Sequence, residues 1–316
     1  MSKHLIKFIG IGILIYILTY KINFKELISS LSTIKPTYLA VLILLDVLFI
    51  FIKMFRWRFV LRCLNINYPT KDLAKIYYLS LILGTFTPAG SGDILTRSAF
   101  LVKDGQRLNA ALVSIFIDRL ADVFVLLLIA LAGFLIFLPL FGLKSLAITL
   151  LIVFLLMCSF LIITIKVLRD FVKKIFLPFV PQTLKNKIIP HLIEAYDNIT
   201  AFGFKRIVIM IGYTLLAQLD NLIFLFILAI ALGISNMPPI YLLLTSALTS
   251  FIVLIPVSVG GLGTREATYI ALFSLYGISA EKSVAFSLTI MLLPLASLAC
   301  ITMIYGLIKL VKKIKI

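Results

Sequence analysis

Six stretches of the chain are apolar over enough residues to cross a lipid bilayer, and this feature decides what the chain can fold into. They lie at about 5–20, 38–55, 108–140, 145–166, 207–233 and 283–308. A transmembrane helix needs about 20 predominantly apolar residues. Hydrophobic residues make up 62% of the 316 residues and charged residues only 14%, which leaves too little polar surface to cover a soluble core. The sequence therefore predicts an all-α integral membrane protein with six full spans, the first of them uncleaved.

Two further apolar stretches are broken in the middle. The stretch at about 73–102 contains Thr87-Pro88-Ala89-Gly90-Ser91-Gly92-Asp93, and the stretch at about 239–276 contains Pro256-Val257-Ser258-Val259-Gly260-Gly261-Leu262-Gly263. Each half is too short to span alone, and the freed backbone groups must be buried in protein or line a cavity. We expect two re-entrant helical hairpins, which makes about eight membrane segments in all. Pairs of tilted full spans are the alternative.

The two broken stretches share a pattern. Pro88-x3-Gly92-x3-Thr96-Arg97 matches Pro256-x3-Gly260-x3-Thr264-Arg265 at an offset of 168 residues. The flanking spans match at the same offset, so we divide the single polytopic domain 1–316 into repeat one at about 38–140, a linker span at 145–166, a basic loop at 167–205 and repeat two at about 206–310. One unpaired span separates the repeats, so we expect the second to be inverted. Inverted repeats with broken helices are typical of secondary transporters.

The net charge of +17 indicates topology rather than a nucleic-acid partner. With the N-terminus inside, 23 of the 30 Lys and Arg residues, including Lys53, Arg56 and Arg97, fall on the cytoplasmic side. Basic residues collect in cytoplasmic loops, so we expect a multi-pass plasma-membrane protein with both termini inside. The basic loop at 167–205 is either an interfacial segment on the anionic inner leaflet or an ordinary loop. Arg119 and Arg265 remain at membrane level.

Each predicted hairpin presents the N-terminus of a half-helix near mid-membrane, one after Gly92 and one after Gly263. Unpaired backbone N–H groups and the helix dipole favour an anion there, and Arg97 and Arg265 follow closely. The candidate substrate-binding residues of the hairpins are Gly90, Gly92, Asp93, Thr96, Arg97, Gly260, Gly261, Gly263, Thr264, Arg265 and Glu266. The alternative is that the glycines only permit tight packing while the arginines extend to the interface.

Acidic residues inside the predicted spans are further candidates. Asp118, Arg119 and Asp122 open the third full span, where they are either functional membrane-level charges or interface residues. Asp46 and Asp220 are possible coupling residues, and Asp220 is alternatively a protonated packing residue. Glu266 either pairs with Arg265 and favours the N-terminus of the half-helix, or acts as an ionisable gate at the second hairpin.

Metal and cofactor chemistry find no support in the sequence. Cys63, Cys158 and Cys300 are widely spaced, and His4 and His191 lie in no metal-binding pattern. We therefore expect no metal, no cofactor and no catalytic residue.

At three motifs the chain resembles the flippase-like family named after the transmembrane region of lysylphosphatidylglycerol synthase. The motifs are the Thr87–Asp93 run with Arg97, Asp118-Arg119-Leu120-Ala121-Asp122, and the run from Ile255 to Glu266. The resemblance implies movement of aminoacylated or other phospholipids between leaflets. In that family a separate soluble domain makes the lysyl ester. Because the chain ends at Ile316, shortly after the last span, we expect a stand-alone member without lysyltransferase activity.

One departure from the family bears on specificity. The family often carries an arginine in the helix after the second hairpin, whereas Phe286-Ser287-Leu288-Thr289-Ile290-Met291 has none. The leading hypothesis is a translocase for an anionic, aminoacylated or polyprenyl-phosphate lipid, whose head group crosses a polar cavity between the repeats. A membrane-embedded transferase acting on a lipid phosphate is the alternative, and a scaffold for a partner enzyme is a third. We expect a membrane phospholipid as the substrate, and either a homo-oligomer or a partner synthase as an associated protein.

Overall fold

The computed structural model describes residues 9–85, 87, 91–136, 150, 153–154, 203–253 and 261–314, and every regular element in these ranges is helical. The elements are α1 (Ile9–Tyr16), η2 (Ile17–Lys21), α2 (Phe24–Ser32), α3 (Pro36–Cys63), α4 (Thr70–Thr85), α5 (Ser91–Lys103), α6 (Leu108–Ile136), α10 (Gly203–Ala231), α11 (Pro239–Val253), α12 (Thr264–Phe273), η5 (Ser274–Tyr276) and α13 (Ala280–Ile314). The predicted all-α class is confirmed. Almost all of the predicted span at 145–166 and the basic loop at 167–205 lie outside the described residues.

Three of the described helices are long and apolar enough to cross a membrane. They comprise Pro36–Cys63, Lys205–Ala231 and Ala280–Met303. Helix α6 has 29 residues, but Asp118, Arg119 and Asp122 interrupt its apolar face. The chain is therefore a helical, multi-pass membrane protein. The exact number of spans stays a prediction.

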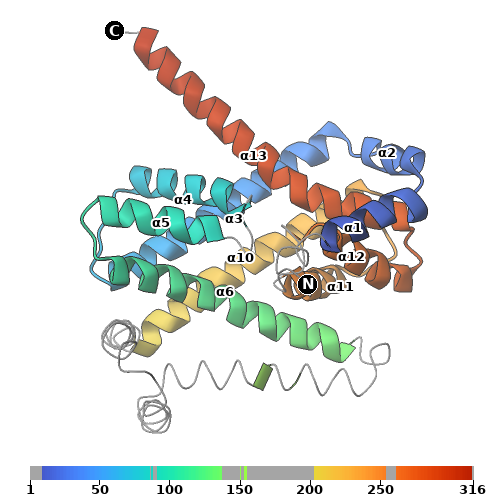
Figure 1. Cartoon of the computed structure of the whole chain (residues 1–316), viewed down its shortest axis with the longest axis horizontal. Coiled ribbons are helices and arrows are strands. Elements are labelled where there is room, and N and C mark those ends of the chain that lie inside the picture. Colours follow the sequence, from blue (N-terminus) through green and yellow to red (C-terminus); the bar gives the residue numbers. More distant parts are fainter. Residues whose placement is uncertain are drawn as a thin grey trace.

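Both broken stretches fold as pairs of short helices, with the breaks where the sequence predicts them. Helices α4 and α5 have 16 and 13 residues, and α11 and α12 have 15 and 10. At 1.5 Å per residue, the longest of these measures about 24 Å, whereas the bilayer core is about 30 Å thick. Within each pair the helices pack against each other, as Figure 1 shows for α4 and α5.

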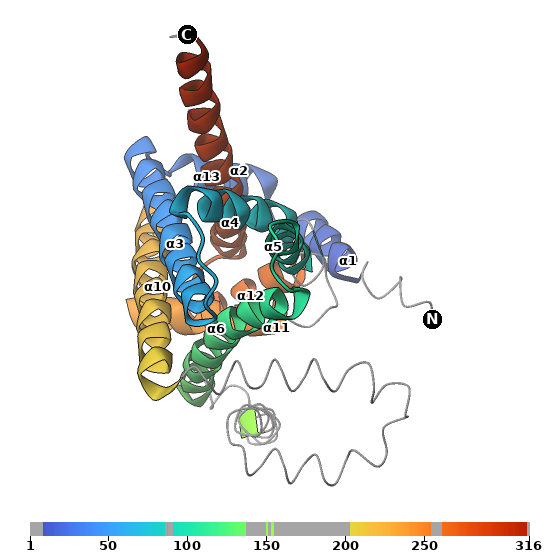
Figure 2. The same cartoon turned by 90° about the vertical axis from the view of Figure 1, so that its left-hand side faces the viewer.

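Helices α3 and α10 run side by side along one edge of the view in Figure 2. The helices around them pack in exchanged pairs: α6 lies against α11 and α10, and α13 lies against α4 and α3. This exchange fits the proposed repeat, in which α3 corresponds to α10, the α4–α5 hairpin to the α11–α12 hairpin, and α6 to α13. Inversion of the second repeat stays a prediction.

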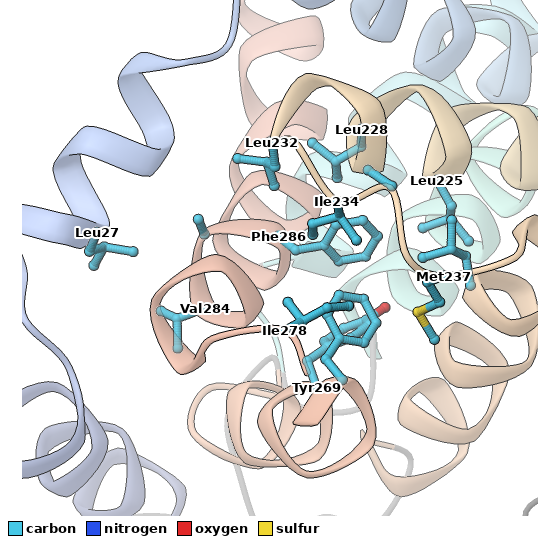
Figure 3. Packing of buried hydrophobic residues seen from close by; sticks show 14 of the residues in the cluster. Leu27, Leu225, Leu228, Leu232, Ile234, Met237, Tyr269, Ile278, Val284 and Phe286 are labelled. Carbon is cyan, nitrogen blue, oxygen red and sulfur yellow. The ribbon is translucent and has the colours of Figure 1, made fainter. Parts of the chain in front are cut away.

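The largest apolar core joins the second hairpin to the N-terminal helices. Figure 3 shows part of it, with residues of α10, α12 and α13 around Phe286. The rings of Tyr269, Phe273 and Phe286 pack edge to face with centroids 5.0 to 5.3 Å apart. In a bilayer such contacts stabilise through van der Waals packing, since lipid tails are as apolar as the side chains.

Candidate functional site

Seven charged side chains from α3, α5 and α6 form one series of ion pairs in which positive and negative groups alternate. The order is Lys53, Asp122, Arg56, Asp118, Arg97, Asp93 and Arg119, with N···O distances from 2.6 to 3.0 Å. We call this series the charge ladder. Its four cations and three carboxylates leave a net charge of +1 when all seven groups are ionised.

The middle of the charge ladder is buried. Arg56, Arg97 and Asp118 are only 0%, 3% and 1% exposed. Asp118 accepts from Arg56 Nε through Oδ1 and from Arg97 Nη1 through Oδ2, both at 2.8 Å. Removing one partner of a buried ion pair leaves an uncompensated charge and costs about 3–5 kcal/mol. Asp118 compensates two guanidinium groups at once, so the ladder depends on it most.

Two aromatic rings also contact the guanidinium of Arg97. Its guanidinium carbon lies 4.8 Å from the ring centroid of Trp57 and 4.4 Å from that of Tyr77. Trp57 in turn donates through Nε1 to the Ser114 hydroxyl at 3.3 Å. A cation over an aromatic face gains further electrostatic stabilisation. The guanidinium of Arg97 is therefore fully engaged within the protein.

The start of α5 brings two members of the ladder to α6. Gly92 donates its N–H to the Thr87 hydroxyl at 2.7 Å, which satisfies a backbone group at the helix start. A Cβ atom on Gly92 would stand 2.3 Å from the carbonyl oxygen of Leu83, so only glycine allows α5 to pack this closely on α4. One and five residues later, Asp93 and Arg97 share a helix face and pair at 2.6 Å.

A cavity of about 480 Å³ lies beside the charge ladder, between α3, α4, α5, α6 and α13. Its lining combines ladder members with apolar side chains such as Phe49, Val123 and Leu298. The side chains of Lys53 and Arg119, the two ends of the ladder, are 22% and 36% exposed. Asp122, which is bound to Lys53, is 29% exposed, so the partly exposed ladder groups at the cavity are two cations and one carboxylate, with a net charge of +1. The volume of the cavity lies in the range of small-molecule sites.

The second hairpin is built around a buried cap. Gly261 and Gly263 have φ angles of 80° and 83°, in the left-handed region that favours glycine. Glu266 is fully buried, and its carboxylate accepts from the Gly263 N–H at 2.6 Å and from the Ser287 hydroxyl at 2.7 Å. A carboxylate at the start of a helix satisfies otherwise unpaired donors. A role at the N-terminus of this half-helix was one of the two interpretations of Glu266 from the sequence.

The predicted site residues divide into two groups. Asp93, Arg97, Asp118, Arg119 and Asp122 all line the one cavity. The second group comprises Gly261, Gly263, Thr264, Arg265 and Glu266, which lie at the start of α12; among the described residues they do not line this cavity. Gly92 lies where α5 packs closely against α4. The hydroxyl of Thr96 donates to the Gly92 carbonyl at 2.6 Å. Gly90 and Gly260 lie outside the described residues.

Two residues of the charge ladder were not predicted as site residues from the sequence. Lys53 and Arg56 were assigned with the cytoplasmic basic residues, but both lie within α3, and Arg56 is fully buried. The side of the membrane on which the two residues lie stays a prediction. The apolar window ends near residue 55, whereas the helix continues to Cys63 because acidic partners on α6 neutralise its cations. The sequence did contain a signal for these ion pairs: α3 carries cations and α6 carries carboxylates.

Asp46 and Asp220 lie outside the ladder. Asp46 lines the same cavity from α3, and Asp220 is 5% exposed on α10.

Within the described ranges, no group of three His, Cys, Asp or Glu side chains could hold a metal ion.

Together the fold and the site define a helical membrane protein with a charged cavity beside a broken helix pair. The chain belongs to the family described as the lysylphosphatidylglycerol synthase TM region, whose profile matches residues 5–301. The family resemblance expected from the motifs is thereby confirmed, and the family connects the chain with membrane lipids. No curated protein and no solved structure matches the chain.

Proposed function

We propose that the protein is a lipid translocase that binds the phosphate head group of an anionic or aminoacylated phospholipid, or of a polyprenyl-phosphate lipid, in the cavity beside the charge ladder. The observation that carries this proposal is the position of Lys53 and Arg119, the exposed ladder ends, on the wall of a partly apolar cavity.

The electrostatics favour an anion. The ladder has an excess of one positive charge, and its inner arginines are neutralised by Asp118 and its neighbours. The excess of one charge therefore belongs to the accessible groups Lys53, Arg119 and Asp122. A Lys ammonium and an Arg guanidinium are both suited to phosphate oxygens, the latter in bidentate geometry. Arg97, which the sequence favoured as a direct ligand, acts in this proposal as a positioning residue.

Exposed apolar side chains on the outer surface are available to contact the acyl chains of the lipid. Leu44, Leu48 and Phe55 on α3 and Leu112 and Phe116 on α6 are exposed, as is expected of side chains that face lipid. A head group in the cavity leaves its tails free to remain in the bilayer. The charged groups stay inside the protein, where they avoid the cost of contact with hydrocarbon.

The exchanged helix packing supports alternating access. If the second repeat is inverted, the two hairpins open toward opposite sides of the membrane. With the positive-inside rule, the end of the molecule that carries the α3–α4 and α5–α6 connections faces the cytoplasm. The first hairpin and its cavity then receive lipid from the inner leaflet of the plasma membrane.

The test uses the full chain in vesicles with fluorescent short-chain phosphatidylglycerol and a membrane-impermeant quencher. We expect protein-dependent redistribution between leaflets, reduced at least about tenfold in the Lys53→Met and Arg119→Met double variant. Such a loss corresponds to about 1.4 kcal/mol. Lys75→Met, an exposed charge outside the cavity, is the matched control and should retain the rate. Redistribution equal to that of protein-free vesicles contradicts the proposal. Covalent conversion of the lipid by the purified chain would instead favour the transferase.

A further inference from the structure

Two carboxyl side chains outside the charge ladder lie on α3 and α10, which pack against each other and run side by side in Figure 2. Asp46 belongs to α3 and Asp220 to α10, and the two groups interact electrostatically. Each is acidic, so the interaction is repulsive when both are ionised.

Both carboxyls lie at the same depth. The start of α3 and the end of α10 are at one end of the molecule, where Lys35 and Gly233 line a common pocket. Asp46 lies ten residues beyond Pro36, and Asp220 eleven residues before Ala231. At 1.5 Å per residue, these separations correspond to about 15 and 16 Å. Each is about half of the 30 Å hydrocarbon thickness, which indicates a position near the middle of the membrane.

Neither carboxyl has the partners that the ladder carboxylates have. Oδ2 of Asp46 is buried without a hydrogen-bond partner, and Ser297 of α13 is its polar neighbour. Asp220 is 5% exposed, and within the described residues no hydrogen bond reaches its carboxyl. A buried carboxylate without a cation is costly, and ionisation of one carboxyl disfavours ionisation of a second one near it.

The surrounding charges belong to the ladder. Across the cavity that Asp46 lines stand Lys53 of α3, Arg119 and Asp122 of α6 and the phenol of Tyr77 of α4. Lys53 is already bound to Asp122 at 2.9 Å. Helix α11 has no acidic or basic residue, and α13 has none between Lys282 and Lys309. The pair therefore has no cation of its own among the described residues.

We propose that Asp46 and Asp220 form a proton-binding site that carries one proton and one negative charge when the cavity is empty, and that it takes up a second proton together with the anionic head group. The inference deepens the proposed function and rests on it for the coupling. Ionised Asp46 places a negative charge on the cavity wall and cancels the +1 excess of the ladder. Protonation removes that charge and restores the attraction for a phosphate. By linkage, a bound head group raises the affinity for the proton by the same factor.

The coupling is tested by binding of short-chain phosphatidylglycerol to the full chain in nanodiscs of a neutral lipid, over a range of pH. We expect the affinity to rise as pH falls, by at most tenfold per pH unit for one linked proton. The Asp46→Asn and Asp220→Asn double variant should bind with an affinity that no longer depends on pH. Asp72→Asn, an exposed carboxyl outside the cavity, should behave as the wild type. A double variant that keeps the full pH dependence overturns the proposal.

A second measurement separates the proton site from the lipid. Infrared spectroscopy of the lipid-free nanodiscs should show a protonated carboxyl band at neutral pH that the double variant lacks and Asp72→Asn retains. Each single variant, Asp46→Asn or Asp220→Asn, should titrate its remaining carboxyl at lower pH, since the second carboxyl is gone. Absence of the band in the wild type overturns the proton site. A normal band without any lipid binding refutes the head-group site and leaves the proton site standing.

Discussion

The two hairpin units of the molecule have a similar arrangement of helices but bury different kinds of side chain. At the offset of 168 residues, Asp118 corresponds to Phe286 and Arg56 to Phe224. The first unit therefore buries a series of ion pairs at positions where the second buries aromatic rings. One architecture thus supports both a charged interior and an apolar one, provided that every buried charge has its partner. The chemistry of the proposed site lies in the first unit, and the second contributes a rigid packed core.

The largest expected difference between the units lies at Asp118. Asp118→Asn removes the negative charge between Arg56 and Arg97 and leaves both buried guanidinium groups undercompensated. We expect the free energy of unfolding to fall by about 3–5 kcal/mol. Denaturant unfolding in detergent micelles measures it, with the exposed Asp72→Asn as the control. A loss below about 1 kcal/mol would show that the ladder does not depend on this carboxylate.

The arginines related by the repeat should then respond differently to the same substitution. Arg97→Met removes a guanidinium that is 3% exposed and bound to two carboxylates and two rings. We expect a loss of about 3–5 kcal/mol. Arg265 is only partly buried. Arg265→Met should therefore lower the free energy of unfolding by only about 1 kcal/mol, well below the loss expected for Arg97→Met. Equal losses in the same unfolding assay would mean that the two hairpins use their arginines alike.

The difference between these arginines also shows how far the sequence can lead. The apolar windows and the glycine-proline breaks predict the helices and the two hairpins well, because both are local properties of the chain. Apart from Asp93–Arg97, the ion pairs are not local: Arg56 and its partner Asp118 are 62 residues apart. For this reason the sequence grouped Arg56 with the cytoplasmic basic residues and did not connect it with Asp118. It likewise treated Arg97 and Arg265 as equivalent, since their different surroundings come from other helices.

A smaller effect is expected at the cap of the second hairpin. Glu266→Met leaves the Gly263 N–H and the Ser287 hydroxyl without their acceptor. An unsatisfied buried donor costs about 1–3 kcal/mol. The loss should appear in unfolding, while the affinity of the first-hairpin cavity for phosphatidylglycerol stays unchanged. A variant that unfolds normally but loses lipid binding would instead place Glu266 in the binding site.

The smallest effect concerns the connections at the end of the first unit. Tyr68, between α3 and α4, donates its hydroxyl to Asp104 after α5, whereas the second unit has Asn236 and Leu272 at these positions. Burial, followed by the hydrogen bond to Asp104, raises the pKa of Tyr68 above its ordinary value. The bond therefore stabilises the fold below pH about 10, the ordinary tyrosine pKa, and is lost as pH rises through the raised pKa. Tyr68→Phe should cost about 1 kcal/mol at neutral pH and should weaken the loss of stability at alkaline pH. An equal loss of stability at alkaline pH in the wild type and in Tyr68→Phe would show that the hydrogen bond from Tyr68 to Asp104 does not stabilise the first unit.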